Sequence, residues 1–427
     1  MACRRNTSTA AGLLLATLAL ASGMARAAAS PGCGTPAPAK LGVLTEVKLA
    51  LNDSVGGERR YFYWLPPSYS ASAQTPAVVS FHGGKSSAKQ QAEIDYFTSP
   101  SFNNNNNPTS SGPPYVVVYP EATFQAGTTS RYWQVSPEMA AQGTDDVGYT
   151  LAVLADLRGR VCLDDSRVYA TGMSQGGGMA NLLACNATSS GLFAAYAPVS
   201  GSYYYRPPAQ SSGGEEAKCH PASDQLPCSP GRSGIPIFAF HGAADATINY
   251  TGGDRRGACT PDIPHWAEQW AVRDKLDASA VVTSTTVNTT TGEQSLGGTA
   301  ERYSYGSGAS SGLVQLIMTG KDAGHVWPAT FSRISEATGL AQGSGPTRFN
   351  ASSLILDFFG RYKLANSTSG PSSSPTSSTG PGIGTNSSPS SSSSSAPNTA
   401  TRQHCDALGA LVSALLFSVV VLSGYIA

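Results

Sequence analysis

Apolar residues in this chain gather in short unbroken runs, separated by polar and glycine-rich stretches. Six runs have the length and composition of strands, at residues 77–81, 115–119, 168–171, 193–199, 237–240 and 313–318. Continuous runs of this kind are typical of parallel strands that are covered on both faces. Two further β-rich segments, 45–51 and 59–64, predict an antiparallel hairpin at the edge of the sheet.

Helical segments alternate with these strands. Asp145 and Asp146 supply capping side chains for a helix that runs through residue 157, and residues 179–185 predict a helix after the 168–171 strand. This alternation predicts an α/β fold, with a mainly parallel central sheet flanked by helices in a single catalytic domain at residues 33–363. Ligands bind such folds at the carboxyl ends of the strands.

A sharp turn after the 168–171 strand carries the sequence Gly172-Met173-Ser174-Gln175-Gly176. Strand, G-x-S-x-G and helix in this order form the nucleophile elbow of the α/β-hydrolase fold, in which tight backbone angles raise the serine hydroxyl above the sheet edge. A second match to the pattern is centred on Ser310, but it lies in a Gly/Ser loop that leads into a strand. We interpret Ser310 as a turn residue and Ser174 as the nucleophile.

A catalytic serine needs a base beside it, and that base needs an acid that holds its tautomer. In this fold the chain order is serine, acid, histidine. His325 follows the last predicted core strand and is the predicted base, and Asp245 follows the 237–240 strand and is the predicted acid. Asp262 and Asp322 are weaker alternatives, because no strand leads into Asp262 and Asp322 is also consistent with a turn residue.

Backbone amides at two strand ends are candidates for an oxyanion hole. Hydrolases of this fold take one N–H from the residue after the nucleophile, here Gln175, and one from the loop after an earlier strand. That loop follows residues 77–81 and contains Gly83, Gly84 and Lys85. The tyrosine run at residues 203–205 follows another strand, so it predicts either substrate contact or surface packing.

Composition narrows the class of protein. The chain has 427 residues, of which 40% are hydrophobic and 13% charged, with a formal net charge of +0. A core of good size can form, and nothing points to nucleic acid.

The two ends predict export. Residues 1–27 predict a signal peptide, since Arg4 and Arg5 precede an apolar stretch and then small residues. Residues 366–400 are rich in Ser, Thr and Pro and predict a disordered stalk. Residues 401–427 combine a polar spacer with an apolar end, which favours a GPI-attachment signal over a transmembrane anchor. We therefore expect an extracellular, cell-surface protein that contacts the membrane only through a lipid anchor.

Six cysteines remain after the two in the predicted leader and tail are set aside. In an oxidising compartment they favour disulfides over a metal site, and no Cys/His pair has zinc-ligand spacing. The helix from 176 to 185 rises about 15 Å, and the preceding strand covers about 20 Å in the opposite direction. We therefore predict that Cys162 bonds Cys185. Cys219 with Cys228 would be a local loop, which leaves Cys33 with Cys259.

Several motifs together resemble the secreted fungal feruloyl esterases, a carbohydrate-esterase family that is also similar to polyhydroxybutyrate depolymerases and acetylxylan esterases. The resemblance covers about residues 33–362 and rests on the elbow at 172–178, His82-Gly83-Gly84, Tyr132-Trp133-Gln134-Val135, and the segments 145–148, 245–250 and 324–328. It implies that Ser174, Asp245 and His325 form the triad of an esterase without a cofactor. The tail departs from the family, whose members are commonly released freely.

The resemblance also implies a substrate, feruloylated plant cell-wall polysaccharide. The ferulate ring would then lie against Trp133, Trp327, Tyr203 or Tyr204. Acetylxylan and polyester are the alternative substrates. A wall-anchored adhesion glycoprotein is the alternative outside enzymes, and it has no need of an activated serine.

Overall fold

The computed structural model describes residues 29–51, 57–99, 103, 114–207, 218–284, 300–321, 323–330, 347 and 349–365. The predicted leader, stalk and tail, together with Asp322, lie outside these residues. Among the described residues, no helix is both long and apolar enough to cross a bilayer.

Ten strands of the described chain form one sheet. Its order is β1-β2-β4-β3-β7-β8-β9-β14-β13-β12. The bounds are β1 Thr45–Leu51, β2 Gly57–Trp64, β3 Thr75–Phe81, β4 Val116–Pro120, β7 Leu163–Met173, β8 Ala195–Val199, β9 Ile237–His241, β14 Val314–Met318, β13 Glu301–Tyr305 and β12 Val281–Ser284. The strands from β4 to β14 in this order pair in parallel, and antiparallel strands border them on both sides.

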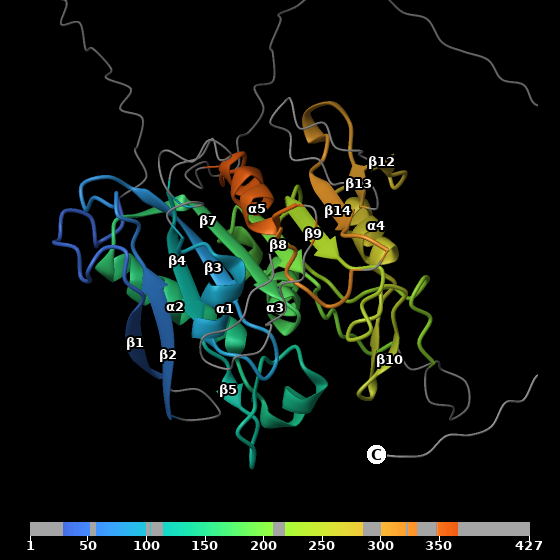
Figure 1. Ribbon diagram of the computed structural model, residues 1–427, viewed down its shortest axis with the longest axis horizontal. Helices are drawn as coiled ribbons and strands as arrows, with labels where there is room; N and C mark the ends of the chain where they lie inside the picture. Colours follow the sequence, from blue (N-terminus) through green and yellow to red (C-terminus); the bar gives the residue numbers. More distant parts are fainter. Residues whose placement is uncertain are drawn as a thin grey trace, which may run out of the picture. The chain divides into compact units, whose positions relative to one another are not determined.

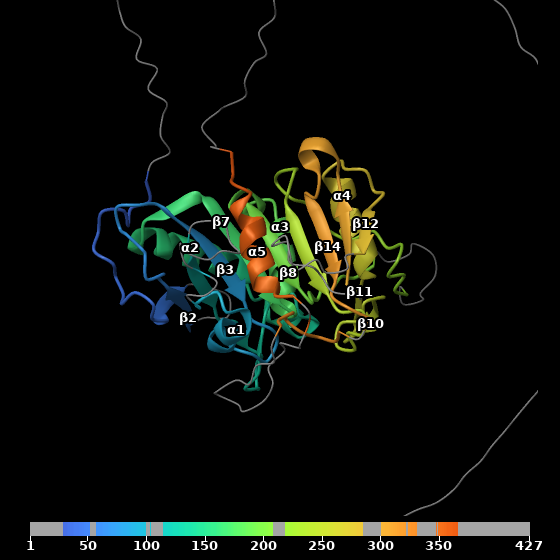
Figure 2. The ribbon, with the colours of Figure 1, turned by 45° about the horizontal axis from the view of Figure 1, so that its top comes forward.

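Helices cover both faces of this sheet. They are α1 Ala88–Asp95, α2 Asp146–Arg160, α3 Gln175–Cys185, α4 Ile263–Arg273 and α5 Ala351–Gly360. One core cluster contains apolar residues of α2, α3 and α4, and a second contains those of α1 and α5. Figure 1 shows α1 and α5 in front of the strands, and α5 again crosses the middle of the sheet in Figure 2. The sheet is therefore the central layer of an α/β/α sandwich, as the sequence predicted.

Two of the motifs from the sequence, residues 132–135 and 145–148, are hydrogen-bonded to each other at the start of α2. Asp145 is the N-cap, and its side chain accepts a hydrogen bond from the Gly148 amide at 2.7 Å. The side-chain oxygen of Gln134 accepts from the backbone amides of Asp146 and Val147, at 2.5 and 2.9 Å. The backbone amide of Gln134 in turn donates to the Asp146 carboxylate at 2.6 Å. The Gln134 side chain thus satisfies N–H groups that a helix leaves without intrahelical partners.

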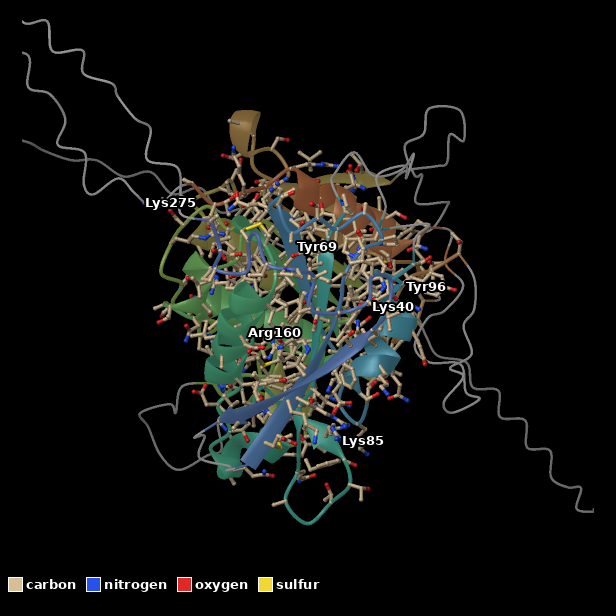
Figure 3. All side chains as sticks on the ribbon, turned by 90° about the vertical axis from the view of Figure 1, so that its left-hand side faces the viewer. Lys40, Tyr69, Lys85, Tyr96, Arg160 and Lys275 are labelled. Atoms are coloured by element: carbon tan, nitrogen blue, oxygen red, sulfur yellow. A yellow bond between two sulfur atoms is a disulfide. The ribbon has the colours of Figure 1, made fainter. Side chains whose placement is uncertain are left out.

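The carboxyl ends of the parallel strands lie at one edge of the sheet. Short hairpins lie beyond it, formed by β5 Thr123–Phe124 with β6 Arg131–Tyr132, and by β10 Gly253–Arg255 with β11 Ala258–Thr260. Figure 1 shows β5 and β10 below the strands, on the side to which the β9 arrow points. In Figure 3, Lys85 lies toward this lower end and Tyr69 toward the upper one.

All three predicted disulfide pairings are wrong, although all six cysteines are bonded. The bonds join Cys33 with Cys162, Cys185 with Cys228 and Cys219 with Cys259. The predicted pairs were Cys162 with Cys185, Cys219 with Cys228 and Cys33 with Cys259. The prediction used the helix rise, which fixes a position along the strand but says nothing of the sideways offset between the helix and the sheet.

The N-terminal segment takes the place beside Cys162 that the prediction gave to Cys185. The Ser30 hydroxyl donates to the Val161 carbonyl at 2.8 Å and accepts from the Leu163 amide at 2.9 Å. These long-range bonds bring Cys33 to a Cα–Cα separation of 4.1 Å from Cys162. Cys185, at the end of α3, is left for Cys228.

Candidate active site

Ser174 occupies the sharp turn between β7 and α3. Its φ of 56° and ψ of −118° are sparsely populated for a residue with a side chain. The turn is fixed from both sides, since the Ser174 amide donates to the Val199 carbonyl at 2.9 Å and its carbonyl accepts from the Gly178 and Ser202 amides at 3.0 Å. The structure therefore has the nucleophile elbow that the sequence predicted.

Glycines flank Ser174 because the backbone of β3 passes very close. A Cβ atom at Gly176 would lie 1.9 Å from the Phe81 carbonyl oxygen, and one at Gly172 would lie 2.5 Å from the same atom. No side chain fits at either position, which is the reason for the small residues of the motif.

Asp245 and His325 meet beside this turn. The Oδ2 atom of Asp245 lies 2.7 Å from Nδ1 of His325. The other carboxylate oxygen, Oδ1, accepts from the amides of Thr247 and Ile248, both at 2.8 Å. Burial alone would raise the pKa of Asp245, but hydrogen bonds with His241 and His325 hold that pKa below its usual range. The carboxylate is therefore fixed and ionised where it faces the imidazole.

His241, which the sequence analysis did not name, is a second imidazole beside this carboxylate. It is the last residue of β9 and is 1% exposed, with its Nε2 atom 3.3 Å from Oδ2 of Asp245 and 2.8 Å from the Ile248 carbonyl oxygen. Its position at a strand end next to the acid was the signal that could have identified it.

The loop that carries His325 is tied to the loop that carries Asp245. The Ala244 amide donates to the Ala323 carbonyl at 3.0 Å, and the Ser200 hydroxyl donates to the Val326 carbonyl at 2.9 Å. A Cβ atom at Gly242 would lie 2.2 Å from the Ala323 oxygen, so the two loops pack backbone against backbone. These contacts hold the imidazole at the sheet edge.

Ser174 and His325 line one cavity of about 180 Å³. Its other lining residues are Gly84, Lys85, Tyr132, Gln175, Ser202, Tyr204, Thr247, Ile248, Arg255 and Arg256. A larger cavity of about 470 Å³ includes Asp165, Pro236 and Leu313. These residues lie at or just before the amino ends of β7, β9 and β14, so the larger cavity is at the edge opposite Ser174.

The alternative residues have other roles. Asp262 is the N-cap of α4, where its side chain accepts from the His265 amide at 3.0 Å. Ser310 ends the short 3-10 helix Gly308–Ser310 before β14, so it is a turn residue as predicted. Neither lines the cavity that contains Ser174.

In the loop after β3, the contacts of His82 fix the orientation of the Gly84 amide. His82 is fully buried, and its Nε2 atom accepts from the Ala122 amide at 3.0 Å, so its Nδ1–H donates to the Gly83 carbonyl at 2.7 Å. Because the peptide bond is planar and trans, the Gly84 N–H points away from that carbonyl. Gly84 also lines the cavity. Its amide and that of Gln175, the first residue of α3, are the best candidates for the oxyanion hole.

The amide of Lys85 does not fit the predicted role. It donates to the Arg131 carbonyl at 2.7 Å, so it is not available to an oxyanion. Gly83 is not among the cavity-lining residues. The prediction of Gly83, Gly84 and Lys85 therefore narrows to Gly84 within this loop.

Both tryptophans predicted to contact substrate are buried in the core instead. Trp133 is 0% exposed, and its indole N–H donates to the His82 carbonyl at 2.7 Å. Trp327 is also 0% exposed, and its indole N–H donates to the Ser352 hydroxyl at 3.0 Å. The prediction was wrong because each indole packs inward, where Trp133 holds the loop after β3 through the His82 carbonyl.

The two tyrosines that were predicted to contact substrate, Tyr203 and Tyr204, have different surroundings. Tyr203 is buried and stacks on Trp266 with ring centroids 4.1 Å apart, so its predicted contact with substrate is wrong. Tyr204 lines the cavity with Ser174. Successive residues of an extended segment point to opposite sides, which explains why only one of the pair faces the site.

Two cavity-lining arginines escaped the sequence analysis. Arg255 and Arg256 lie at the tip of the β10–β11 hairpin, far along the chain from Ser174. The only signal was the Arg-Arg-Gly turn between two short β-rich segments. Among the described residues, no cluster of His, Cys, Asp or Glu could hold a metal ion.

The parallel sheet, the elbow at Ser174 and the acid and histidine loops at neighbouring strand ends define the α/β-hydrolase class. Within that class, residues 59–213 match the family described as Esterase PHB depolymerase. This match confirms the resemblance that the motifs indicated.

A curated relative is Feruloyl esterase B of Piromyces equi, 25% identical over 195 residues. The match covers 46% of this chain and 31% of that protein, so the chain spans about a third of its relative's length. Relative and family match together support a carboxylic ester hydrolase.

Two solved structures are also similar. An acetyl xylan esterase from Aspergillus awamori is 19% identical, with a TM-score of 0.43, over 66% of this chain and 94% of that one. A ferulic acid esterase from Anaeromyces mucronatus is 14% identical, with a TM-score of 0.38, over 49% and 75% of the two chains.

Proposed function

We propose that this protein is a serine esterase that hydrolyses feruloyl or related hydroxycinnamoyl esters of plant cell-wall polysaccharide. The observation that carries the proposal is that His325, paired with Asp245, lines the same cavity as Ser174, which lies on a strained elbow. A binding protein has no use for a serine presented in this way. The similarity to Feruloyl esterase B supports the choice of acyl group.

The reaction proceeds through an acyl-enzyme. The Ser174 oxygen attacks the ester carbonyl while Nε2 of His325 takes the hydroxyl proton. The developing oxyanion receives hydrogen bonds from the Gly84 and Gln175 amides, and the proton on His325 passes to the alcohol as the C–O bond breaks. Water then attacks the acyl-enzyme with His325 as base, which releases the carboxylic acid and restores Ser174.

Asp245 supports His325 throughout. Its carboxylate accepts the Nδ1 proton, so Nε2 is the nitrogen that faces the reaction. The imidazolium that forms during attack is stabilised by the adjacent negative charge, which stays ionised because the pKa of Asp245 is low.

Acetyl is the second candidate for the acyl group, so that the enzyme would act on acetylxylan. The small cavity, about 180 Å³, favours compact acyl groups. Kinetics with methyl ferulate, acetylated xylan and polyhydroxybutyrate will separate the candidates. A higher kcat/KM for methyl ferulate supports the proposal, and hydrolysis of acetylated xylan alone would replace feruloyl by acetyl. A protein inert on every ester would contradict the esterase itself.

A further inference from the structure

Three cationic residues line the cavity beside Ser174. Lys85, Arg255 and Arg256 contribute to its wall, and none of the described residues that line it is Asp or Glu. The cations come from two separate loops, one after β3 and one at the β10–β11 tip. Neutral feruloyl and acetyl groups offer no charge to match this surface.

Most of this charge is not neutralised by the protein. Arg256 forms an ion pair with Glu138. Within the described part of the chain, neither Lys85 nor Arg255 has a carboxylate within ion-pair distance. An anion that enters the cavity therefore meets a net positive field, which a low-dielectric wall strengthens.

Arg255 is held in a defined orientation. Its Nε–H donates to the Tyr204 hydroxyl at 3.1 Å, and Tyr204 itself lines the cavity. The hairpin is anchored at its base, because Cys259 bonds Cys219 and pairs with Tyr205 as an antiparallel bridge. Nε is engaged, so the two terminal nitrogens of the guanidinium remain for a planar, bidentate partner such as a carboxylate.

The turn at the tip retains an arginine under backbone strain. Arg256 has a φ of 54° and Gly257 a φ of 71°, which is the two-residue turn that Asn-Gly forms most readily. Strained residues of this kind cluster at ligand sites. The Arg256 side chain is 35% exposed, so it lies at the outer rim of the cavity.

We propose that these cations form a subsite for a carboxylate on the alcohol part of the ester, namely a uronic-acid unit of the polysaccharide. Arg255 provides the bidentate contact, and Arg256 and Lys85 add to the field at the rim. The rim faces the alcohol part because the acyl group must bond Ser174 inside, while a polymer has to remain outside. The inference rests on the proposed esterase function and adds that the preferred substrate carries a negative charge on its alcohol part.

A matched pair of acetyl esters tests this inference. The probes are 4-acetoxybenzoate, with a carboxylate on the leaving alcohol, and its neutral methyl ester. We expect wild-type kcat/KM to favour the carboxylate about tenfold. In the double variant Arg255→Gln with Arg256→Gln, the preference for the carboxylate should disappear, mainly through a higher KM. The single variant Arg255→Lys should keep only part of the preference, because an ammonium group cannot form two parallel hydrogen bonds to a carboxylate. Salt at 0.5 M should reduce the wild-type ratio.

Arg361→Gln is the matched control, because Arg361 is an exposed arginine of the α5 C-terminus that forms an ion pair with Asp357. Its ratio should equal that of the wild type. An unchanged ratio in the double variant would overturn the carboxylate subsite while the esterase stands. If the double variant lost more kcat/KM on 4-acetoxybenzenesulfonate than on 4-acetoxybenzoate, the choice of carboxylate would be overturned. A wild type that hydrolyses neither these two esters nor methyl ferulate would instead contradict the esterase function.

Discussion

The Oδ2 atom of Asp245 lies 2.7 Å from Nδ1 of His325, although 80 residues separate the two in the chain. The opposite oxygen of the same carboxylate is held by two backbone amides, so the carboxylate cannot rotate away. Nδ1 of His325 therefore has its partner in Asp245, and His325 lines the same cavity as Ser174.

Ser174→Ala should lower kcat by about 10⁴-fold or more, because no other group forms the acyl-enzyme. Steady-state hydrolysis of methyl ferulate measures the effect. Ser310→Ala is the control, since Ser310 matches the same sequence pattern outside the elbow, and it should keep full activity. Hydrolysis that survives Ser174→Ala would exclude the proposed triad.

Asp245→Asn should lower kcat by about 10³- to 10⁴-fold. The Thr247 and Ile248 amides require an acceptor, so the Asn oxygen will stay with them and its NH₂ group will face Nδ1 of His325. That donor forces the proton onto Nε2, which is the wrong tautomer for a base. Asp262→Asn is the control and should leave kcat within about twofold, because Asp262 caps α4. Equal losses in the two variants would contradict the assignment.

Gly84→Ala should reduce kcat by about 10²-fold with a small change in KM, because an oxyanion donor acts mainly in the transition state. The new Cβ atom would lie 2.8 Å from the Gln175 side chain, which displaces the loop and its amide. Gly159→Ala in α2 has open space around it and serves as the control. A purely raised KM in Gly84→Ala would show that the loop binds substrate without stabilising the oxyanion.

Removal of the Cys33–Cys162 bond by a double change to Ser should lower the free energy of unfolding by about 2 to 5 kcal/mol. The bond closes 129 residues and lies before β7, at the edge of the sheet opposite Ser174. Urea unfolding and kinetics at 25 °C check both parts, and kcat/KM should remain within about twofold. A large loss of kcat in fully folded protein would contradict this separation of stability from catalysis.

His82 should make the protein less stable in acid. Burial lowers the pKa of His82 from 6.5 to about 4. Its stabilising contribution is complete above pH 6.5 and is lost as the pH falls toward 4, by about 3 kcal/mol. His82→Asn removes the titration and keeps a donor for the Gly83 carbonyl. The stability advantage of wild type over this variant should therefore shrink from pH 7 to pH 4 in urea titrations; parallel curves would contradict the prediction.

Asp95 should act in the opposite direction. Burial raises the pKa of Asp95 from 3.8 to about 6, against hydrogen bonds from Ser80 and the Phe97 amide. Its contribution is complete below pH 3.8 and is lost as the pH rises through 6, by about 2 to 3 kcal/mol. The loss of unfolding free energy in Asp95→Asn, relative to wild type, should therefore be largest at pH 4 and smallest at pH 7 in urea titrations. A comparison that does not vary with pH would mean that Asp95 is ionised in the folded protein throughout this range.

Local patterns predicted the frame of this site well. Apolar runs predicted the parallel strands, and the pentapeptide around Ser174 predicted the elbow, because both depend on short-range backbone sterics and burial. Chain order brought Asp245 and His325 together in the prediction, and the two residues do meet, since parallel strands bring their carboxyl ends to one edge of the sheet. Their catalytic roles stay a prediction.

Other features depended on the orientation of loop side chains and on the offset between layers, neither of which can be read from the sequence. Trp133 and Tyr203 follow strands or sit in motifs as Tyr204 does, yet they turn into the core, because the orientation of a loop side chain follows from its packing. The cysteine partners depend on sideways offsets between layers, which the rise of a helix does not fix.

The sequence by itself determined the α/β class, the elbow and the order of the acid and the histidine, since each follows from local sterics or from topology. Only the tertiary structure decided the disulfide partners, the engagement of the Lys85 amide and the arrival of Arg255 at the cavity. These are long-range contacts, and their free energy comes from groups that meet only after the layers have packed.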